Sequence, residues 1–130
     1  GSSVIAYTIE NASRVAAALG FLAVALGAFG AHGLKAVLTQ HGTVEIWEKA
    51  VLYHFVHVVM LFVLAERPSL ARGPWFCFLA GILIFSGSLY LLAVTNLRWL
   101  GAITPVGGVS FLVGWGWLAC RSFNKPDAPR

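Results

Sequence analysis

The chain has 130 residues, of which 58% are hydrophobic and 11% are charged, and its mean hydropathy is +0.80. A water-soluble domain of this length cannot bury so much apolar surface, so the composition excludes that class and indicates a membrane protein. The formal net charge is +4. Its basic residues are dispersed over the loops and the tail, so we expect no nucleic-acid partner.

Four segments are long and apolar enough to cross a bilayer, which takes a helix of about 20 residues. The expected spans are residues 13–33, 44–65, 75–95 and 99–120. They leave no room for a soluble domain, so we predict an all-α fold: one domain, 1–130, that is an integral membrane bundle of four transmembrane helices. Residues 1–3, "GSS", resemble the remnant of a cleaved expression tag and are set aside.

The distribution of basic residues predicts the orientation of the bundle. With four spans, both termini lie on the same side. That side carries Arg14, Arg67, Arg72, Arg121, Lys125 and Arg130, whereas the opposite side carries Lys35, Lys49 and Arg98. Positive residues concentrate on the cytoplasmic side of membrane proteins, so both termini are expected in the cytoplasm.

Small residues recur at spacings of three and four along the first span. They are Ala16, Gly20, Ala23, Gly27, Gly30 and Ala31. Such a ridge lets helix backbones approach closely in lipid, and we expect it to pack within the chain rather than in a dimer. Asn11 or Ser13 is the expected N-cap of this helix.

The segment 34–42 has a short helical apolar stripe and predicts an interfacial helix that ends at Gly42. Thr43 is the expected N-cap of the second span. In the fourth span, Pro105 should either kink the helix or delay its start. Gly107 and Gly108 follow it at positions suited to helix packing. An aromatic belt at the two membrane interfaces is expected from Trp47, Trp75, Trp99, Trp115 and Trp117.

The polar side chains at membrane depth gather in the half of the bundle away from the termini. The candidate cluster consists of His32, Glu48, Tyr53, His54 and His57. Polar groups in lipid must find partners or water, so we predict a polar cluster facing the extracytoplasmic side. His54 and His57 lie about 60° apart on a helical wheel, which is close enough to serve one site.

Three interpretations of this cluster remain open. The favoured one is structural, with side chains that hydrogen-bond between helices. The second is a proton or ion relay, because imidazole titrates near neutral pH. The third is a metal or haem site, because imidazole suits such ligation. We expect no cofactor under the favoured interpretation. No nucleophile–base pair or phosphate-binding loop stands out, so we do not expect an enzyme.

Four motifs in order resemble one known family. They are "LGAFGAHGLK" (26–35), "WEKAVLYHFVH" (47–57), "FSGSLY" (85–90) and "LGAITPVGGVSFLVGW" (100–115). Together they resemble the domain of unknown function 423 family, small bacterial proteins related to animal transmembrane protein 256. The resemblance implies a four-helix protein of the bacterial cytoplasmic (inner) membrane and no particular activity. It also implies His at the position of His57 and either His or Gln at that of His54.

We therefore expect a small multi-pass membrane protein that acts as an accessory or interaction subunit. Besides membrane lipid, its expected partner is another membrane protein or a second copy of the chain. The first alternative is an oligomeric small transporter or channel that uses His57 and His54 as a relay. The second alternative is a metal- or haem-binding redox subunit.

Overall fold

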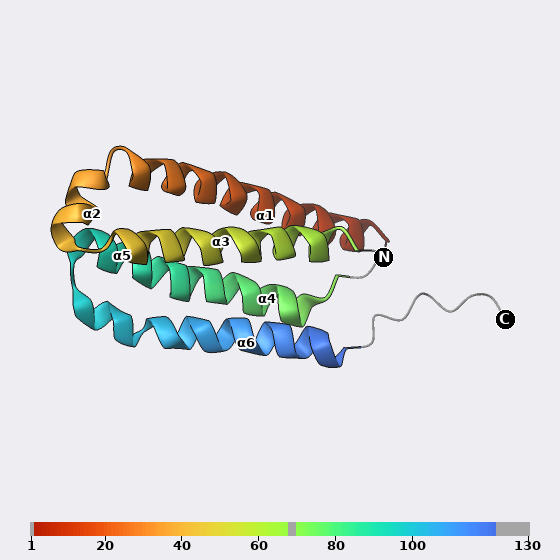
Figure 1. Ribbon diagram of the computed structural model, residues 1–130. Coiled ribbons are helices and arrows are strands. Elements are labelled where there is room, and N and C mark those ends of the chain that lie inside the picture. The colour runs from red at the N-terminus through yellow and green to blue at the C-terminus, as the bar shows by residue number, and fades with distance from the viewer. Residues whose placement is uncertain (1, 68–69, 122–130) are drawn as a thin grey trace.

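The structure is a computed structural model that describes residues 2–67 and 70–121, with side chains from residue 10 onward. Every regular element in this part of the chain is helical (Figure 1). The elements are α1 (Ser2–Ala31), α2 (Lys35–His41), α3 (Val44–Ala65), α4 (Arg72–Gly81), the π-helix η1 (Ile82–Ser86), α5 (Gly87–Thr95), the 3₁₀-helix η2 (Arg98–Ala102) and α6 (Thr104–Cys120).

In the described part of the chain, four helical segments are long and apolar enough to cross a membrane, which confirms the predicted all-α membrane fold. They are Glu10–Ala31, Val44–Ala65, Arg72–Thr95 and Arg98–Cys120. α1 begins and α6 ends at the same end of the bundle, which we call the terminal end; the opposite end is the α2 end (Figure 1). Gly1, Lys125 and Arg130, which entered the tag and orientation predictions, lie outside the described residues. The cytoplasmic placement of the terminal end stays a prediction.

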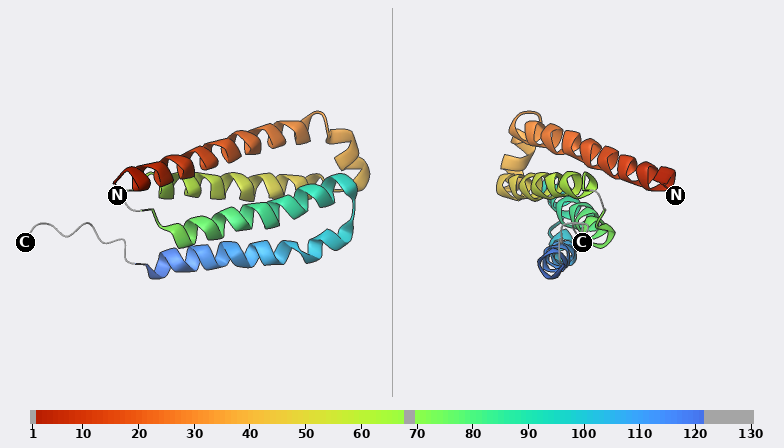
Figure 2. Two further views of the ribbon diagram at one scale, coloured as in Figure 1. Left: turned by 180° about the vertical axis from the view of Figure 1, so that it is seen from behind. Right: turned by 90° about the vertical axis from the view of Figure 1, so that its right-hand side faces the viewer.

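The spans lie in order across the bundle rather than in a closed square. α1 packs mainly on α3, α3 packs on the third span, and the third span packs on α6 (Figure 2). The third span is formed by α4, η1 and α5 together. α1 and α6 are therefore the two edges of the bundle, and each has one principal neighbour.

The ridge of small residues on α1 packs against α3 within the chain. Ala16 and Ala23 are fully buried. A side chain added at Gly20 would meet Val58, and one added at Gly30 would overlap the Trp47 ring. A Cβ at Gly27 would only touch Val51, at 3.4 Å. Close approach of two helix backbones is what small residues provide in lipid.

The expected N-cap of the first helix is wrong, because α1 already begins at Ser2. Inside a helix, a hydroxyl at Ser13 is not needed to cap the N-terminal amides. It instead donates a hydrogen bond of 3.0 Å to the Glu66 carboxylate, just after α3. This contact joins α1 to the end of α3 at the terminal end of the bundle.

The short helix predicted in segment 34–42 is present as α2, and it ends at Gly42 with a φ of 67°. Glycine adopts this left-handed conformation without a steric penalty. Thr43 occupies the N-cap position of α3, but its hydroxyl makes no cap. It donates to the Ala93 carbonyl at 2.7 Å instead. Ala93 lies in the last turn of α5, where helix carbonyls lack intrahelical partners. This explains why the Thr43 hydroxyl donates to α5 instead of capping α3.

The third span contains a π-helical segment, Ile82–Ser86, that the sequence pattern does not predict. α6 approaches it closely at Gly107, where an added Cβ would overlap the backbone nitrogen of Phe85. A Cβ at Gly108 would stay 3.8 Å from the Phe85 ring, so Gly107 is the position that requires glycine. π-Helical turns are rare and widen a helix locally.

The fourth span begins with 3₁₀-helix η2, and its α-helix starts only at Thr104. Pro105 therefore lies in the first turn of α6, where its missing amide hydrogen costs no helical hydrogen bond. Of the two expectations for Pro105, the late helix start is the one observed.

The aromatic belt is only partly as expected, because Trp47 and Trp75 are buried inside the bundle. Their indole N–H groups donate to backbone carbonyls, Trp47 to Leu26 at 2.9 Å and Trp75 to Leu61 at 3.2 Å. Hydropathy alone does not distinguish a tryptophan at the membrane surface from one whose N–H is satisfied by a neighbouring helix.

Candidate functional site: the polar links of the second span

His57 is buried in the middle of α3, and both of its ring nitrogens have partners. Nδ1 lies 2.7 Å from the Tyr53 carbonyl, and Nε2 lies 3.0 Å from the indole nitrogen of Trp115 on α6. A carbonyl only accepts and an indole N–H only donates. The proton must therefore be on Nδ1, and Nε2 must accept, which describes a neutral imidazole in one tautomer.

The His57 ring also stacks on an aromatic side chain of α6. Its centroid lies 3.7 Å from that of Phe111, with 11° between the planes. The centroid of the Phe78 ring of α4 lies 5.3 Å from that of His57. The α3 and α6 backbones do not pack closely against each other, because the third span lies between them. His57 is thus a side-chain link across the bundle that uses hydrogen bonds and stacking at once.

His54 makes a different link, toward the third span. Its Nδ1 lies 2.8 Å from the hydroxyl of Tyr90 on α5. The side chain is 2% exposed, and Nε2 has no hydrogen-bond partner among the described residues. The backbone of Leu19 on α1 interacts with the ring, but without the geometry of a hydrogen bond to Nε2. His54 is the one buried polar side chain of the described part that keeps an unpaired atom.

The other three predicted cluster residues are not joined to the two imidazoles by side-chain hydrogen bonds. Tyr53 is 39% exposed, and its ring packs on Phe85 with centroids 4.7 Å apart. The side chains of Glu48 and His32 are exposed and have no hydrogen-bond or ion-pair partner in the described ranges 10–67 and 70–121. The structure therefore divides the predicted cluster into separate links and exposed groups.

Several polar links lie between helices that the sequence pattern did not pair. The Ser86 hydroxyl donates to the Ala50 carbonyl at 2.8 Å, and Ser110 donates to the Cys77 carbonyl at 2.6 Å. Ser88 and Thr104 share a hydrogen bond of 2.6 Å. Serine and threonine commonly join helices in membranes in this way. Hydroxyl residues on small-residue faces are the sequence signal for such links, but they do not identify the partner.

A second group of hydrogen bonds that the sequence did not predict lies at the α2 end. The His41 ring nitrogen Nδ1 lies 3.2 Å from the Ala93 carbonyl, which also accepts from Thr43. Arg98 donates to the His41 carbonyl at 2.9 Å and to the Asn96 side chain at 2.8 Å. These contacts satisfy the end of α5 and fasten α2 to the turn between the third and fourth spans.

The two imidazoles of α3 do not form one ligand site in this arrangement. His54 is directed to Tyr90 on α5, whereas His57 is directed to Trp115 on α6. Nε2 of His57 accepts the indole proton and has no lone pair left for a metal ion. Among the described residues, no group of three or more His, Cys, Asp or Glu side chains is placed to hold a metal.

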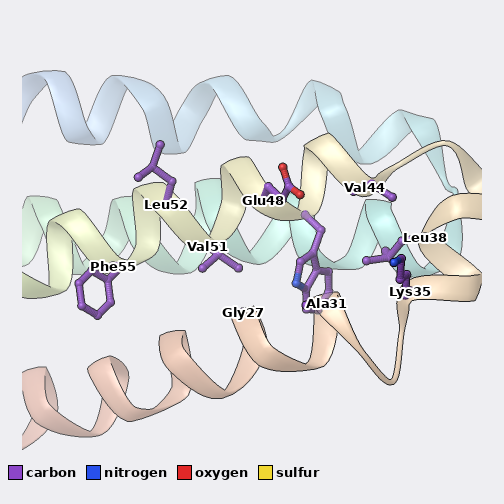
Figure 3. A pocket seen from close by; sticks show the side chains of 11 residues that line it. Gly27, Ala31, Lys35, Leu38, Val44, Glu48, Val51, Leu52 and Phe55 are labelled. Carbon is purple, nitrogen blue, oxygen red and sulfur yellow. The ribbon is translucent and has the colours of Figure 1, made fainter.

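A groove of about 550 Å³ opens between α1, α2 and α3 at the α2 end (Figure 3). Its walls are mainly apolar and include Gly27, Leu52 and Phe55. Lys35 of α2 lies at the α2 end of the groove, Glu48 of α3 lies nearer its middle, and Phe55 lies toward the other end (Figure 3). A second groove, of about 420 Å³, borders α1 near the terminal end. α1 is therefore flanked by open space at both ends.

Four apolar spans, joined by histidine, tyrosine, tryptophan and serine side chains, define a small helical membrane protein that crosses the bilayer several times. The profile of one protein family, described as "Protein of unknown function (DUF423)", matches residues 26–108. The chain belongs to this family, as its four motifs indicated.

The relatives are bacterial proteins whose names describe them as membrane proteins. The chain is 46% identical to the UPF0382 membrane protein YwdK of Bacillus subtilis, over 72% of this chain and 80% of that protein. It is 41% identical to a UPF0382 membrane protein of Staphylococcus aureus and 43% identical to one of Staphylococcus haemolyticus. Each of these two matches covers 79% of this chain and 87% of the relative. No solved structure matches the chain significantly.

These relatives and the four spans establish a small multi-pass membrane protein of unassigned role. Helical proteins of this kind reside in the cytoplasmic membrane of bacteria.

Proposed function

We propose that the chain is an accessory or interaction subunit that binds another membrane protein within the plane of the membrane, along the edge of the bundle formed by α1. The observation that carries this proposal is the one-sided packing of α1, which has α3 as its principal neighbour (Figure 2). Only 11% of the apolar window of the first span is buried, compared with 44% in the third span. A helix held on one side offers the rest of its surface to lipid or to a partner helix.

The exposed side of α1 has the composition of a helix-packing surface. Ala17, Phe21, Val24 and Ala28 are all exposed and follow one another at spacings of four, three and four. Residues at these spacings lie on one face of a helix. Small residues at its two ends permit close approach of a second helix, and the central Phe21, 79% exposed, offers a large contact area.

Site-specific photo-crosslinking in the native bacterial host tests this proposal. A photoreactive phenylalanine analogue at Phe21 on α1 is compared with one at Leu112 on α6, which is 71% exposed and serves as the matched control. We expect a discrete protein adduct from position 21 that untagged chain competes away, and only lipid adducts from position 112. Lipid adducts alone at both positions, or the same proteins at both, would refute a partner surface on α1.

A proton or ion relay is the second candidate, and one observation favours it. Nε2 of His54 is buried without a hydrogen-bond partner in the described part, and Nδ1 of the same ring contacts the Tyr90 hydroxyl. An ionisable side chain that keeps one ring nitrogen without a partner inside a membrane span is a candidate for ion transfer. Proton flux into liposomes that is present with the wild-type chain and lost in His54→Phe would favour this candidate. Flux equal to that of empty liposomes would remove it.

A further inference from the structure

We infer that the groove between α1, α2 and α3 is a binding site for one zwitterionic phospholipid with a primary ammonium group, of the phosphatidylethanolamine class. The groove has a volume of about 550 Å³, which lies within the range of about 300–1,000 Å³ for small-molecule sites. This inference goes beyond the proposed partner surface, because it concerns a different part of α1 and a different ligand.

The length of the groove favours a lipid chain over a partner helix. Its lining on α3 runs from Val44, the first residue of the helix, to Phe55. At a rise of about 1.5 Å per residue this is roughly 16 Å. The hydrocarbon core of a bilayer is about 30 Å thick, so the groove spans one leaflet. A transmembrane helix of a partner would need a contact surface through both leaflets.

The charges favour a zwitterionic headgroup. Lys35 and Glu48 both line the groove, and Figure 3 shows Lys35 at its α2 end and Glu48 nearer its middle, on α3. Both side chains are exposed, and neither forms an ion pair with the other or with another residue of the described ranges. A phospholipid that enters from the α2 end brings a phosphate that Lys35 can bind and an ammonium whose N–H groups Glu48 can accept.

The side chains that line the two walls of the groove suit an acyl chain. Leu52 is 60% exposed and Phe55 is 45% exposed, and both line the groove. On the opposite wall, Gly27 has no side chain, and the exposed Ala31 has only a methyl group. The chain thus presents an apolar channel with a basic group at its α2 end and an acidic group nearer its middle.

Native mass spectrometry of the delipidated full-length chain in mild detergent tests this site. Phosphatidylethanolamine, phosphatidylcholine and phosphatidylglycerol with identical acyl chains are the probes. We expect one tightly bound phosphatidylethanolamine. Lys35→Gln and Glu48→Gln should each weaken its binding about fivefold, the effect of about one charge at a membrane surface. Lys49→Gln and Glu45→Gln are the matched controls, because these exposed residues do not line the groove.

Blocking the groove gives a second, independent readout. Ala31→Trp places a large ring at an exposed lining position and should abolish the specific complex, whereas Leu22→Trp, at an exposed position of α1 outside both the lining and the proposed partner face, should not. The inference would be overturned if the three lipids bind equally and none of these variants alters their binding. A preference for phosphatidylglycerol would overturn the recognition of an ammonium group. A dimer that Ala31→Trp dissociates would assign the groove to a second copy of the chain. The two glutamine variants change only exposed side chains, so they remain informative if Ala31→Trp does not fold.

Discussion

The hydrogen bond between His57 and Trp115 should contribute measurably to the stability of the bundle. The indole nitrogen lies 3.0 Å from Nε2 of the imidazole. Trp115→Phe removes the N–H donor and keeps an aromatic ring at the position. It leaves Nε2 of a buried histidine without a partner, since Nδ1 is bound to the Tyr53 carbonyl. Interhelical hydrogen bonds in membranes are worth about 0.6 kcal/mol on average and up to about 1.7 kcal/mol.

We expect Trp115→Phe to lower the free energy of unfolding by about 1 kcal/mol, above that average, because the acceptor is buried and cannot turn to water. The measurement is reversible unfolding in mixed micelles with increasing sodium dodecyl sulfate, followed by far-ultraviolet circular dichroism. Trp99→Phe is the matched control. Trp99 is 62% exposed, and its N–H makes no hydrogen bond in the described part, so its loss should change the free energy by less than about 0.5 kcal/mol.

A double-mutant cycle with His57→Phe separates the hydrogen bond from other effects of each substitution. Phenylalanine keeps a flat ring to stack on Phe111, and any crowding that it causes occurs in both arms of the cycle. We expect a coupling free energy of about 1 kcal/mol between positions 57 and 115. A coupling indistinguishable from zero would refute the assignment of His57 as a link between α3 and α6.

Three further predictions concern packing, capping and orientation. Gly107→Val should destabilise the bundle by about 1–3 kcal/mol because its Cβ overlaps the Phe85 backbone, whereas Gly116→Val, in open space, should not; equal effects would contradict this. Thr43→Val should cost about 1 kcal/mol through the lost bond to Ala93, and exposed Thr39→Val should cost nothing measurable. In a chain otherwise free of cysteine, Thr39→Cys should react with an impermeant maleimide added outside intact cells; protection until lysis would reverse the orientation.

The composition and hydropathy pattern were sufficient to predict the four spans. Lipid provides no hydrogen-bond partners for the backbone, so a long apolar segment that crosses it has to be a helix. The local sequence alone is therefore enough to predict such a helix. The predicted second span, 44–65, has the same limits as α3. The ridge of small residues likewise predicted the close contact of α1 with another helix, because backbone approach depends on side-chain size alone.

The π-helical turn and the interior tryptophans could not be predicted in this way. The π-helix at Ile82–Ser86 lies opposite Gly107, which is distant in the sequence, and the spacing of local side chains does not reveal such a contact. Trp47 fits a membrane interface by composition, yet it is buried because Gly30 leaves room for its ring and the Leu26 carbonyl accepts its proton. Such pairings depend on which helices are neighbours.

The candidate polar cluster was only partly predictable for the same reason. Hydropathy identified His54 and His57 as costly groups that require partners, and both are buried. It did not identify Tyr90 and Trp115 as those partners, because helical spacing gives the direction of a side chain but not the helix that it faces. Glu48 was assigned to the cluster by its height in the membrane, although it lies on another face of α3 and lines the groove.

The most direct test of the structural role of His57 is nitrogen-15 nuclear magnetic resonance of its side chain at neutral pH, in the full-length protein in detergent or lipid. The geometry predicts a neutral ring that is protonated at Nδ1, with Nε2 accepting the proton of Trp115. Trp115→Phe should shift the Nε2 signal and leave Nδ1 protonated. A ring protonated at Nε2, a doubly protonated ring, or a metal-bound Nε2 would contradict a role as a structural link and would favour a relay or a ligand site.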